Sequence, residues 1–357
     1  MANVRAIAHI ALGRGYSQNE RQTVLLIKKL AELGVKQMLI CNARSPLVIH
    51  LKGVAGLTLL RLSGGDLRFN GHIKVGRRYP LVHAHDEEGA QWSFLHYMIF
   101  GVPYLISLRT PHFNASGLLN KALFLWARSV VCASEDIAHS VEVEAELDKV
   151  KVIANSIVAG KPDQRKVAEI RSAYGNRFIV GEVASFSNRK FGQATLIESV
   201  RILKTPIPSI VAFFIGDGDP RVLAEHASGM SNVKFLKLRY STLREQIAAL
   251  DVFVMPVNEG SEEELMLILD AMDLGVPVVT TDFAGVKTHV RDGVSGLIVP
   301  KNDPKALAAA ILSLRDNPSL RDRLIANGRD EALKSSPEIM AMQYYDLYRT
   351  LLPDNPA

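Results

Sequence analysis

The sequence predicts an α/β protein with two consecutive doubly wound domains, each a parallel sheet with helices on both faces. The chain has 357 residues, which is too long for one ordinary hydrophobic core and suits two domains. Short apolar runs of strand length alternate with segments whose apolar residues recur at helical spacing. This alternation restarts after a hinge-like stretch at residues 156–163. Strands that alternate with helices favour parallel sheets covered on both faces.

The first domain opens with a strand at residues 4–12 and a glycine-containing loop at residues 13–17. Residues 20–34 then repeat apolar side chains at helical spacing and end at Gly34, a typical helix terminator. The other elements expected in this domain are strands at 36–41, 81–85, 103–108, 130–133 and 150–154, and a helix at 88–100.

The second domain repeats the same alternation. Its expected strands are at 178–184, 210–215, 232–236, 252–256, 276–280 and 297–299, and its expected helices at 192–203, 242–250, 265–274, 303–316 and 319–333. We place the domains at residues 1–158 and 159–336. The last helix, within residues 337–357, could pack back on the first domain.

Composition narrows the class of protein. Apolar residues make up 48% of the chain and charged residues 22%, which is typical of a soluble globular protein. No run approaches the roughly 18 apolar residues of a spanning helix, and the N-terminus lacks the apolar segment of a signal peptide. The two cysteines, Cys41 and Cys132, give neither a metal-ligand spacing nor a disulfide framework. We therefore expect a cytoplasmic protein.

Charge is distributed unevenly along the chain. Residues 1–128 contain 16 Lys or Arg against 6 Asp or Glu, whereas the remaining 229 residues contain 26 against 31. A basic first domain suits an anionic acceptor, an anionic membrane surface or nucleic acid, and it could also be merely a basic surface.

The stretch EGSEEELMLILDAMDLGVPVV at residues 259–279 carries the most specific signal. It follows an apolar strand, so its acids lie at the carboxyl end of a parallel sheet, where such folds bind ligands. The free N–H groups of the following helix would attract a diphosphate. Asp270 lies eight residues after Glu262, about two turns along the same helix face, and could bind a ribose diol. These acids could also be present only because the helix dipole favours them.

Three motifs in the second domain resemble those of family 4 glycosyltransferases, which have the GT-B fold. They are LDAMDLGVPVV at 269–279, DGVSGLIVP at 292–300 and NDPKAL at 302–307, and they occur in the family's order. The resemblance implies two Rossmann-like domains facing a cleft. It extends more weakly over residues 1–150.

The first half of the acidic motif departs from the family pattern. Counting back eight from Asp270 selects Glu262 as the first motif acid, and Glu259 replaces it if the loop carries an insertion. The second motif acid is Asp where the family has Glu, and Leu265 stands where the family has Gly. We expect Glu262 to touch the donor sugar and Asp270 the ribose, while Glu263 and Glu264 face solvent.

Other residues are carried over from the resemblance. The turn Gly216-Asp217-Gly218 resembles the family's turn near the donor base, and either Arg189 or Lys190 would neutralise the donor phosphate. Arg109 occupies the place of a family active-site His, with His112 three residues further on. The implied catalytic residues are Asp86, Arg109, His112 and Glu262, and the implied donor-binding residues are Gly15, Arg189, Lys190, Gly216, Gly218, Glu263, Leu265, Met266 and Asp270. His83 and His85 also suggest a metal site, but no further ligand can be placed, so no metal is predicted.

The resemblance implies a retaining glycosyltransferase that uses a UDP-, GDP- or ADP-sugar and needs no metal or other cofactor. Because residues 1–128 are basic, we expect an anionic envelope glycan or glycolipid acceptor, such as lipopolysaccharide core. Peripheral contact with the inner face of the cytoplasmic membrane is also expected, and nucleic acid is not an expected partner. Two alternatives remain: a GT-B sugar-nucleotide epimerase, or a catalytically weakened GT-B protein that binds glycans or a partner.

Overall fold

The computed structural model describes residues 4–109, 118–145, 149–158, 160–186, 192–239 and 242–352. The chain divides into two compact units, which are described separately below. Unit 1 comprises Met1–Ser156 with Pro337–Ala357, and unit 2 comprises Ile157–Ser336. Each unit is a parallel sheet with helices on both faces, as the sequence predicts.

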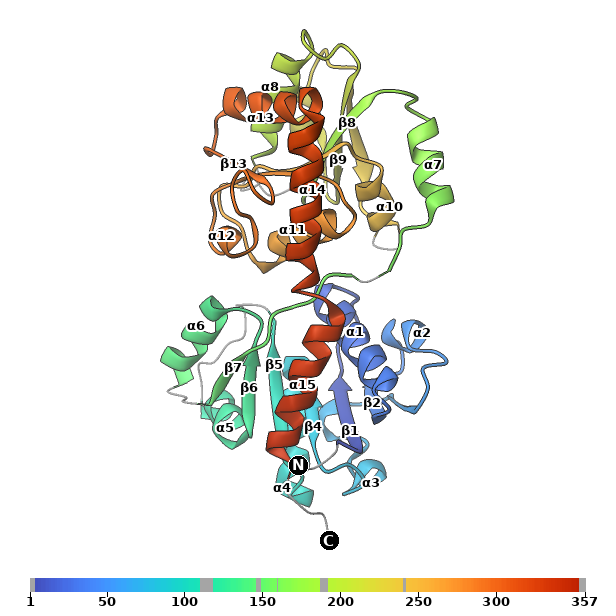
Figure 1. Cartoon of the computed structure of the whole chain (residues 1–357). Coiled ribbons are helices and arrows are strands. Elements are labelled where there is room, and N and C mark those ends of the chain that lie inside the picture. The colour runs from blue at the N-terminus through green and yellow to red at the C-terminus, as the bar shows by residue number, and fades with distance from the viewer. Residues whose placement is uncertain are drawn as a thin grey trace. The chain divides into compact units, whose positions relative to one another are not determined.

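Unit 1 contains a seven-stranded parallel sheet with the order β3-β2-β1-β4-β5-β6-β7 (Figure 1). Successive strands are added on one side of β1 up to β3 and then on its other side from β4 to β7. The switch point of the sheet therefore lies between β1 and β4. The strands are β1 Ala6–Ala11, β2 Lys36–Asn42, β3 Leu57–Leu62, β4 Val82–Ala84, β5 Tyr104–Leu108, β6 Ser129–Cys132 and β7 Val150–Val152. The sequence analysis missed β3, whose side chains are mostly only partly buried and give a weak apolar signal.

Helices of unit 1 cover both faces of this sheet. One face packs against α1 and α15, and the other packs against α4, α5 and α6. The helices are α1 Gln18–Glu32, α2 Leu47–His50, η1 Leu67–Phe69, α3 His72–Val75, α4 Glu87–Phe100, α5 Leu118–Trp126, α6 Glu135–Ala145 and α15 Pro337–Leu351. The last helix, α15, buries Met340, Tyr344 and Tyr348 against the sheet, at the spacing of one helix face.

Unit 2 contains a six-stranded parallel sheet with the order β10-β9-β8-β11-β12-β13, and its switch point lies between β8 and β11. The strands are β8 Phe178–Val183, β9 Ile210–Gly216, β10 Val233–Lys237, β11 Val252–Met255, β12 Val278–Thr281 and β13 Leu297–Val299. All six were expected from the sequence.

One face of the unit 2 sheet packs against α10 and α11, and the other packs against α8 and α13. The helices are α7 Gln164–Ser172, α8 Gln193–Leu203, α9 Arg221–His226, α10 Leu243–Ala248, α11 Glu262–Asp273, α12 Val286–His289, α13 Pro304–Asp316 and α14 Pro318–Leu333. In the described part of the chain, no helix is both long enough and apolar enough to cross a membrane.

Candidate functional site

The carboxyl ends of β8 and β9 in unit 2 approach each other at Gly216, the last residue of β9. A Cβ atom at this position would lie 2.1 Å from the carbonyl oxygen of Ala184 and 2.7 Å from the ring of Phe186, so only glycine fits. Gly218 follows with a φ of 89°, which also favours glycine. The turn predicted from the sequence therefore requires both glycines for its backbone path. Its contact with a donor base stays a prediction.

Gly192 brings the start of α8 against the end of β11. A Cβ atom there would lie 1.7 Å from the carbonyl oxygen of Pro256, and the residue has a φ of 24°. Among the described residues no side chain caps α8, and the first turn of this helix contains no acidic residue. The free N–H groups at its N-terminus therefore favour an anion. Arg189 and Lys190, the predicted phosphate-binding cations, lie outside the described residues.

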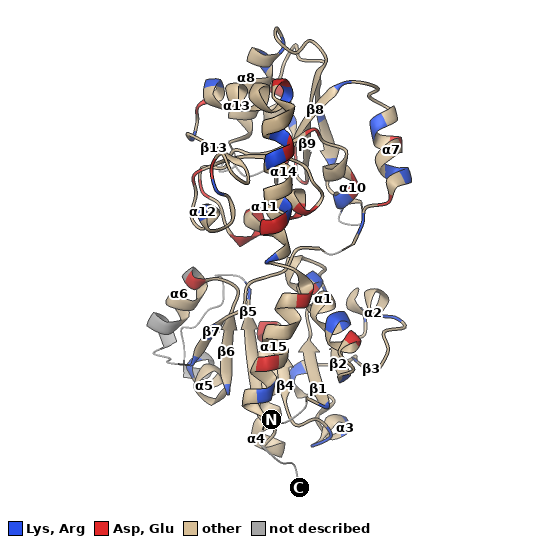
Figure 2. Cartoon of the chain, viewed as in Figure 1, with Lys and Arg blue, Asp and Glu red and all other residues tan. Residues whose placement is uncertain are grey.

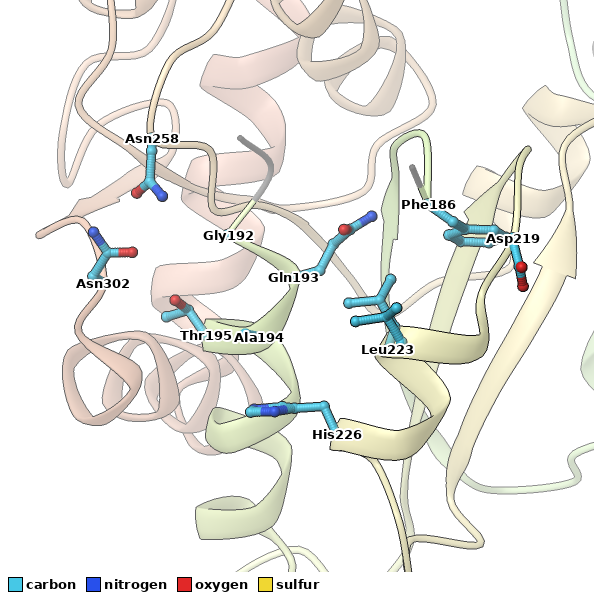
Figure 3. Close-up of a pocket in the computed structure, with 11 residues that line it drawn as sticks. Phe186, Gly192, Gln193, Ala194, Thr195, Asp219, Leu223, His226, Asn258 and Asn302 are labelled. Carbon is cyan, nitrogen blue, oxygen red and sulfur yellow. The ribbon is translucent and has the colours of Figure 1, made fainter. Parts of the chain in front are cut away.

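A cavity of about 550 Å³, hereafter the α8 cavity, lies beside this helix start. Figure 3 shows Asn258 and Asn302 on one side of the first turn of α8, and Phe186 and Leu223 on the other. Asn258 Oδ1 is buried and has no hydrogen-bond partner among the described residues. The cavity thus combines amide groups, an aromatic ring and a helix N-terminus that no described side chain caps. These are suitable contacts for a polar ligand that carries a ring and an anionic group.

The start of α11 differs from the start of α8, because its own side chains occupy its N–H groups. Ser261 is the N-cap, and Ser261 and Glu264 form a capping box in which Ser261 N donates to Glu264 Oε2 at 2.7 Å. Glu264 is buried, so the expectation that it faces solvent is wrong, because its carboxylate caps the helix. Glu263 is exposed as expected, and Glu262 is partly buried. A diphosphate at this helix start would meet acidic side chains and N–H groups that are already paired.

The two motif acids contact different surroundings. Asp270 is buried, accepts a hydrogen bond from Val158 N at 2.8 Å, and lies 3.4 Å from Arg244 Nη1. Arg244 also pairs with Asp273 at 2.6 Å. Glu262 lies about 12 Å away along the helix axis, at 1.5 Å per residue. The two acids would therefore touch different parts of a ligand, and the predicted ribose and sugar contacts stay predictions.

Leu265 and Met266, two further predicted donor-binding residues, belong to the core of unit 2. Both side chains are buried, and both pack in the cluster that joins α11 to the sheet. Leu265 Cδ1 would lie 3.0 Å from a Cβ atom built at Gly285. The structure therefore gives these two side chains a packing role, which leaves only their backbone for a ligand.

In unit 1, Asp86 joins the loop after β1 to the start of α4. Its Oδ1 accepts from Gly89 N at 2.7 Å and caps the helix, and its Oδ2 accepts from Gly13 N at 2.9 Å. Burial raises the pKa of this carboxyl to about 6, although the backbone N–H groups of Gly13 and Gly89 oppose the shift. Gly15, predicted as donor-binding, is exposed in the same loop, where added side-chain atoms would contact nothing.

Three histidines converge beneath the carboxyl edge of this sheet, and sequence analysis identified only two of them. The ligand nitrogens of His9, His83 and His85 lie within 4.8 Å of one another, and all three side chains are buried. His9 could have been found from the parallel pairing of the first strand with β4, which places it beside His83.

Both ring nitrogens of His9 and of His83 are already hydrogen-bonded. His9 Nδ1 lies 2.9 Å from His85 Nε2, and His9 Nε2 is hydrogen-bonded to Gln37 Oε1. His83 Nδ1 lies 2.7 Å from Tyr348 Oη, and His83 Nε2 lies 2.7 Å from Ser107 Oγ. A metal ion would have to break these hydrogen bonds, so the arrangement fits a hydrogen-bond network better than a metal site.

Arg109 follows β5 and is buried beside this cluster. Its Nη1 donates to Asn155 Oδ1 at 2.7 Å, and its guanidinium carbon lies 5.9 Å from the centre of the Tyr344 ring. Its Nε and Nη2 have no hydrogen-bond partner among the described residues. His112, the other predicted catalytic residue in this region, lies outside the described residues.

Solved structures share the fold of this chain over nearly its whole length. A crystal structure of Anabaena HepE in complex with UDP and glucose superposes with a TM-score of 0.78 at 18% identity, covering 96% of this chain and 99% of that one. A glycosyltransferase from Rickettsia africae gives a TM-score of 0.78 at 16% identity, covering 99% and 100%. At these identities the likeness shows the fold alone, and that fold is GT-B, as the sequence predicts.

Sequence comparisons match the second unit of the chain to glycosyltransferases. Residues 177–317 match the family model described as glycosyl transferases group 1. The chain is 28% identical over 162 residues to a phosphatidyl-myo-inositol mannosyltransferase of Mycobacterium leprae, covering 45% of this chain and 43% of that protein. It is 32% identical over 206 residues to the lipopolysaccharide core biosynthesis glycosyltransferase LpsE of Rhizobium meliloti, covering 56% and 58%. Residues 177–317 are thus similar to the group 1 glycosyltransferases, in agreement with the resemblance seen in the sequence. The match spans about half the length of each of these two relatives.

Proposed function

We propose that the chain is a retaining glycosyltransferase that moves a sugar from a nucleotide-sugar donor to an acceptor hydroxyl. The observation that carries this proposal is the α8 cavity at the carboxyl edge of the unit 2 sheet, bordered by the uncapped start of α8. The family match covers this region. A structural relative of the same fold, HepE, was solved with UDP and glucose.

In this proposal the bond between the sugar and the donor diphosphate breaks, and the leaving diphosphate takes up negative charge. The N–H groups at the start of α8 stabilise that charge, and Arg189 or Lys190 adds a cation. Phe186 and Leu223 offer an apolar surface to a ring of the donor, while Asn258 and an adjacent amide orient its polar groups. No metal is assigned a role.

The donor site can be tested with two exposed valines of unit 2. Val222 lines the α8 cavity, whereas Val294 lies outside it. Val222→Glu places a carboxylate in the cavity and should weaken UDP binding about tenfold or more, because like charges repel in a partly desolvated site. Val294→Glu is the matched control and should bind UDP like the parent chain. Equal UDP affinity in both variants, measured by calorimetric titration, would remove the α8 cavity from the proposal.

For the acceptor we propose an anionic envelope glycan or glycolipid, such as lipopolysaccharide core. The excess of Lys and Arg in residues 1–128 supports this choice, and so does the likeness to LpsE. The likeness to a phosphatidyl-myo-inositol mannosyltransferase agrees with a lipid-linked acceptor.

Unit 1 also presents a surface suited to peripheral membrane contact, which we call the α3–α5 surface. Its apolar side chains are exposed: Ile73 on α3, Met98 and Ile99 on α4, and Trp126 on α5. These helices are joined, since Arg77 Nε donates to Phe100 O at 2.8 Å and the Tyr97 and Trp126 ring centres lie 5.7 Å apart. Exposed basic residues accompany them: Lys74, Arg77, Arg78 and Arg128. Figure 2 colours the Lys and Arg positions of unit 1 blue along the ribbon.

Apolar side chains among basic ones fit the interface of an anionic bilayer, where each cation near the surface adds about 1 kcal/mol. Ile73→Asp should reduce co-sedimentation with phosphatidylglycerol vesicles, and added salt should reduce binding of the parent chain. Ile49→Asp is the matched control, since Ile49 is an exposed isoleucine of α2, outside this surface. Equal binding of both variants, or equal binding to neutral vesicles, would refute the membrane contact.

An epimerase and a glycan-binding protein remain as alternatives. Incubation with a panel of nucleotide sugars in the absence of acceptor distinguishes them from the proposed transferase. An epimerised nucleotide sugar would identify the first alternative, and failure to bind any nucleotide sugar would favour the second.

A further inference from the structure

A chain of buried hydrogen bonds in unit 1 fixes the proton positions on two histidines. Gln37 Nε2 donates to the carbonyl oxygen of Ile27 at 2.9 Å, which orients the amide and turns Gln37 Oε1 toward His9 Nε2 at 3.0 Å. Because an amide oxygen only accepts hydrogen bonds, His9 Nε2 must carry a proton. Burial lowers the pKa of His9 to about 3, so the ring is neutral and its Nδ1 carries none.

His9 Nδ1 therefore accepts a hydrogen bond from His85 Nε2, 2.9 Å away. Burial also lowers the pKa of His85 well below its usual value, and the neighbouring His83, His9 and Arg109 add to the shift. The ring of His85 is thus neutral, with its proton on Nε2 and a lone pair on Nδ1. That Nδ1 is buried and has no partner among the described residues. Within the described residues, this chain of hydrogen bonds leaves one acceptor without a partner, His85 Nδ1.

Arg109 presents the complementary group. Its unpartnered nitrogens, Nε and Nη2, form one edge of the guanidinium, whose two N–H bonds run parallel. This edge is the one that binds a carboxylate or phosphate with two parallel hydrogen bonds. In the described part of the chain, the Arg109 guanidinium contacts the amide of Asn155 and the Tyr344 ring. A buried cation in these surroundings is stabilised strongly by an anion.

The two groups lie at the carboxyl edge of neighbouring strands. His85 follows β4 and Arg109 follows β5, and these strands pair beside the switch point of the sheet. Neighbouring rings in tilted contact connect them, with ring centres 3.9 Å apart for His85 and His83 and 5.1 Å apart for His83 and Tyr344. Ligands of doubly wound sheets bind at this edge.

We propose that His85 Nδ1 and the Nε/Nη2 edge of Arg109 form a subsite for the acceptor, and that they bind a hydroxyl group next to a carboxylate or phosphate. This rests on the proposed transferase function and narrows its acceptor to a hydroxylated acidic sugar or a polyol phosphate. The hydroxyl donates to His85 Nδ1, and the acidic group accepts two hydrogen bonds from Arg109.

The experiment titrates the full chain with glucuronate, glycerol 1-phosphate, glucose and UDP. Long-range ¹⁵N NMR of histidine-labelled protein reports on His85 Nδ1, and calorimetry gives the affinities. We expect the NMR signal of His85 Nδ1 to shift with glucuronate or glycerol 1-phosphate, and glucose to bind much more weakly. Arg109→Lys keeps the charge but removes the bidentate edge, and it should lower the affinity for the acidic probe about tenfold or more.

Three further measurements distinguish an acceptor subsite from a donor contact and from a buried water. Arg5→Lys, at an exposed arginine of the same unit outside the α3–α5 surface, is the matched control and should leave acidic-probe binding unchanged. Unchanged UDP affinity in Arg109→Lys shows that the variant is folded and that the donor site is separate. If UDP affinity falls in parallel, the anion belongs to the donor and the acceptor subsite is refuted. If no acidic probe shifts His85, a buried water satisfies these atoms and the inference is wrong. Loss of UDP binding by the parent chain would refute only the proposed function.

Discussion

Glu182 in β8 gives the sharpest prediction about pH dependence. Its carboxyl group is only 1% exposed, and neither oxygen has a hydrogen-bond partner of normal geometry among the described residues. Burial raises the pKa of Glu182 well above its usual value, and the nearby Gln193 offsets only part of the shift. The group therefore holds its proton in the folded protein at pH values where the unfolded chain has released it.

The sign of the effect follows from proton linkage. Above the unfolded pKa of about 4.3, the folded state binds more protons than the unfolded state, so stability falls as pH rises. The loss is about 1.4 kcal/mol per pH unit and continues until the pH reaches the folded pKa of Glu182. Glu182→Gln removes this titration. The variant should gain stability relative to the parent chain by that amount for each pH unit above the unfolded pKa.

The assay is urea unfolding of the full chain at pH 5, 6, 7 and 8, followed by circular dichroism. Buried Gln has a constant cost of its own, so only the pH dependence of the difference tests the reasoning. Glu225→Gln is the control, because Glu225 is an exposed residue of the same unit. A stability difference that stays constant across this range would show that Glu182 is ionised or well solvated, and would refute the argument.

Two other predictions concern the hydrogen bond between α15 and His83 and the glycine at the start of α8. Tyr348→Phe removes the hydroxyl that lies 2.7 Å from His83 Nδ1 and should lower the free energy of unfolding by about 1–3 kcal/mol. The control, Tyr174→Phe in unit 2, should lower it less. Equal losses would show that α15 does not depend on that hydrogen bond. Gly192→Ala should abolish UDP binding, because its Cβ would meet Pro256 O at 1.7 Å and displace the start of α8. Unimpaired UDP binding by this variant would show that the start of α8 lies outside the donor site.

The fold was accessible from the sequence because burial on both faces of a parallel sheet leaves continuous apolar runs. All strands of unit 2 were expected for this reason. The boundaries of α11 were less accessible: the helix was expected from residue 265, but it begins at Glu262. Ser261 and Glu264 form an S-x-x-E capping box that the sequence displays, and attention to this pattern would have placed the start correctly.

The candidate site was accessible only in part, because side chains that converge from distant strands leave no local pattern. His9 and His85 are 76 residues apart, and their contact depends on the pairing of β1 with β4. Arg109 was selected from the resemblance. The position of its guanidinium is set by contacts with Asn155 and Tyr344, and no pattern in the sequence connects these two residues to Arg109. Glu182 showed no motif at all and is recognisable only by its burial.

The acids of the 259–279 stretch illustrate how one sequence pattern divides into separate roles. Glu264 is occupied as a helix cap, and Asp270 is occupied by Val158 N and Arg244. An Asp at this position ends one methylene earlier than the Glu of the family motif, so its reach toward a ligand beyond the sheet edge is shorter. Gly260 packs so closely that a Cβ atom would lie 2.2 Å from the Phe283 ring, which fixes the loop that carries Glu259. The choice between Glu262 and Glu259 as first motif acid therefore depends on whether the first turn of α11 or this loop meets the donor sugar.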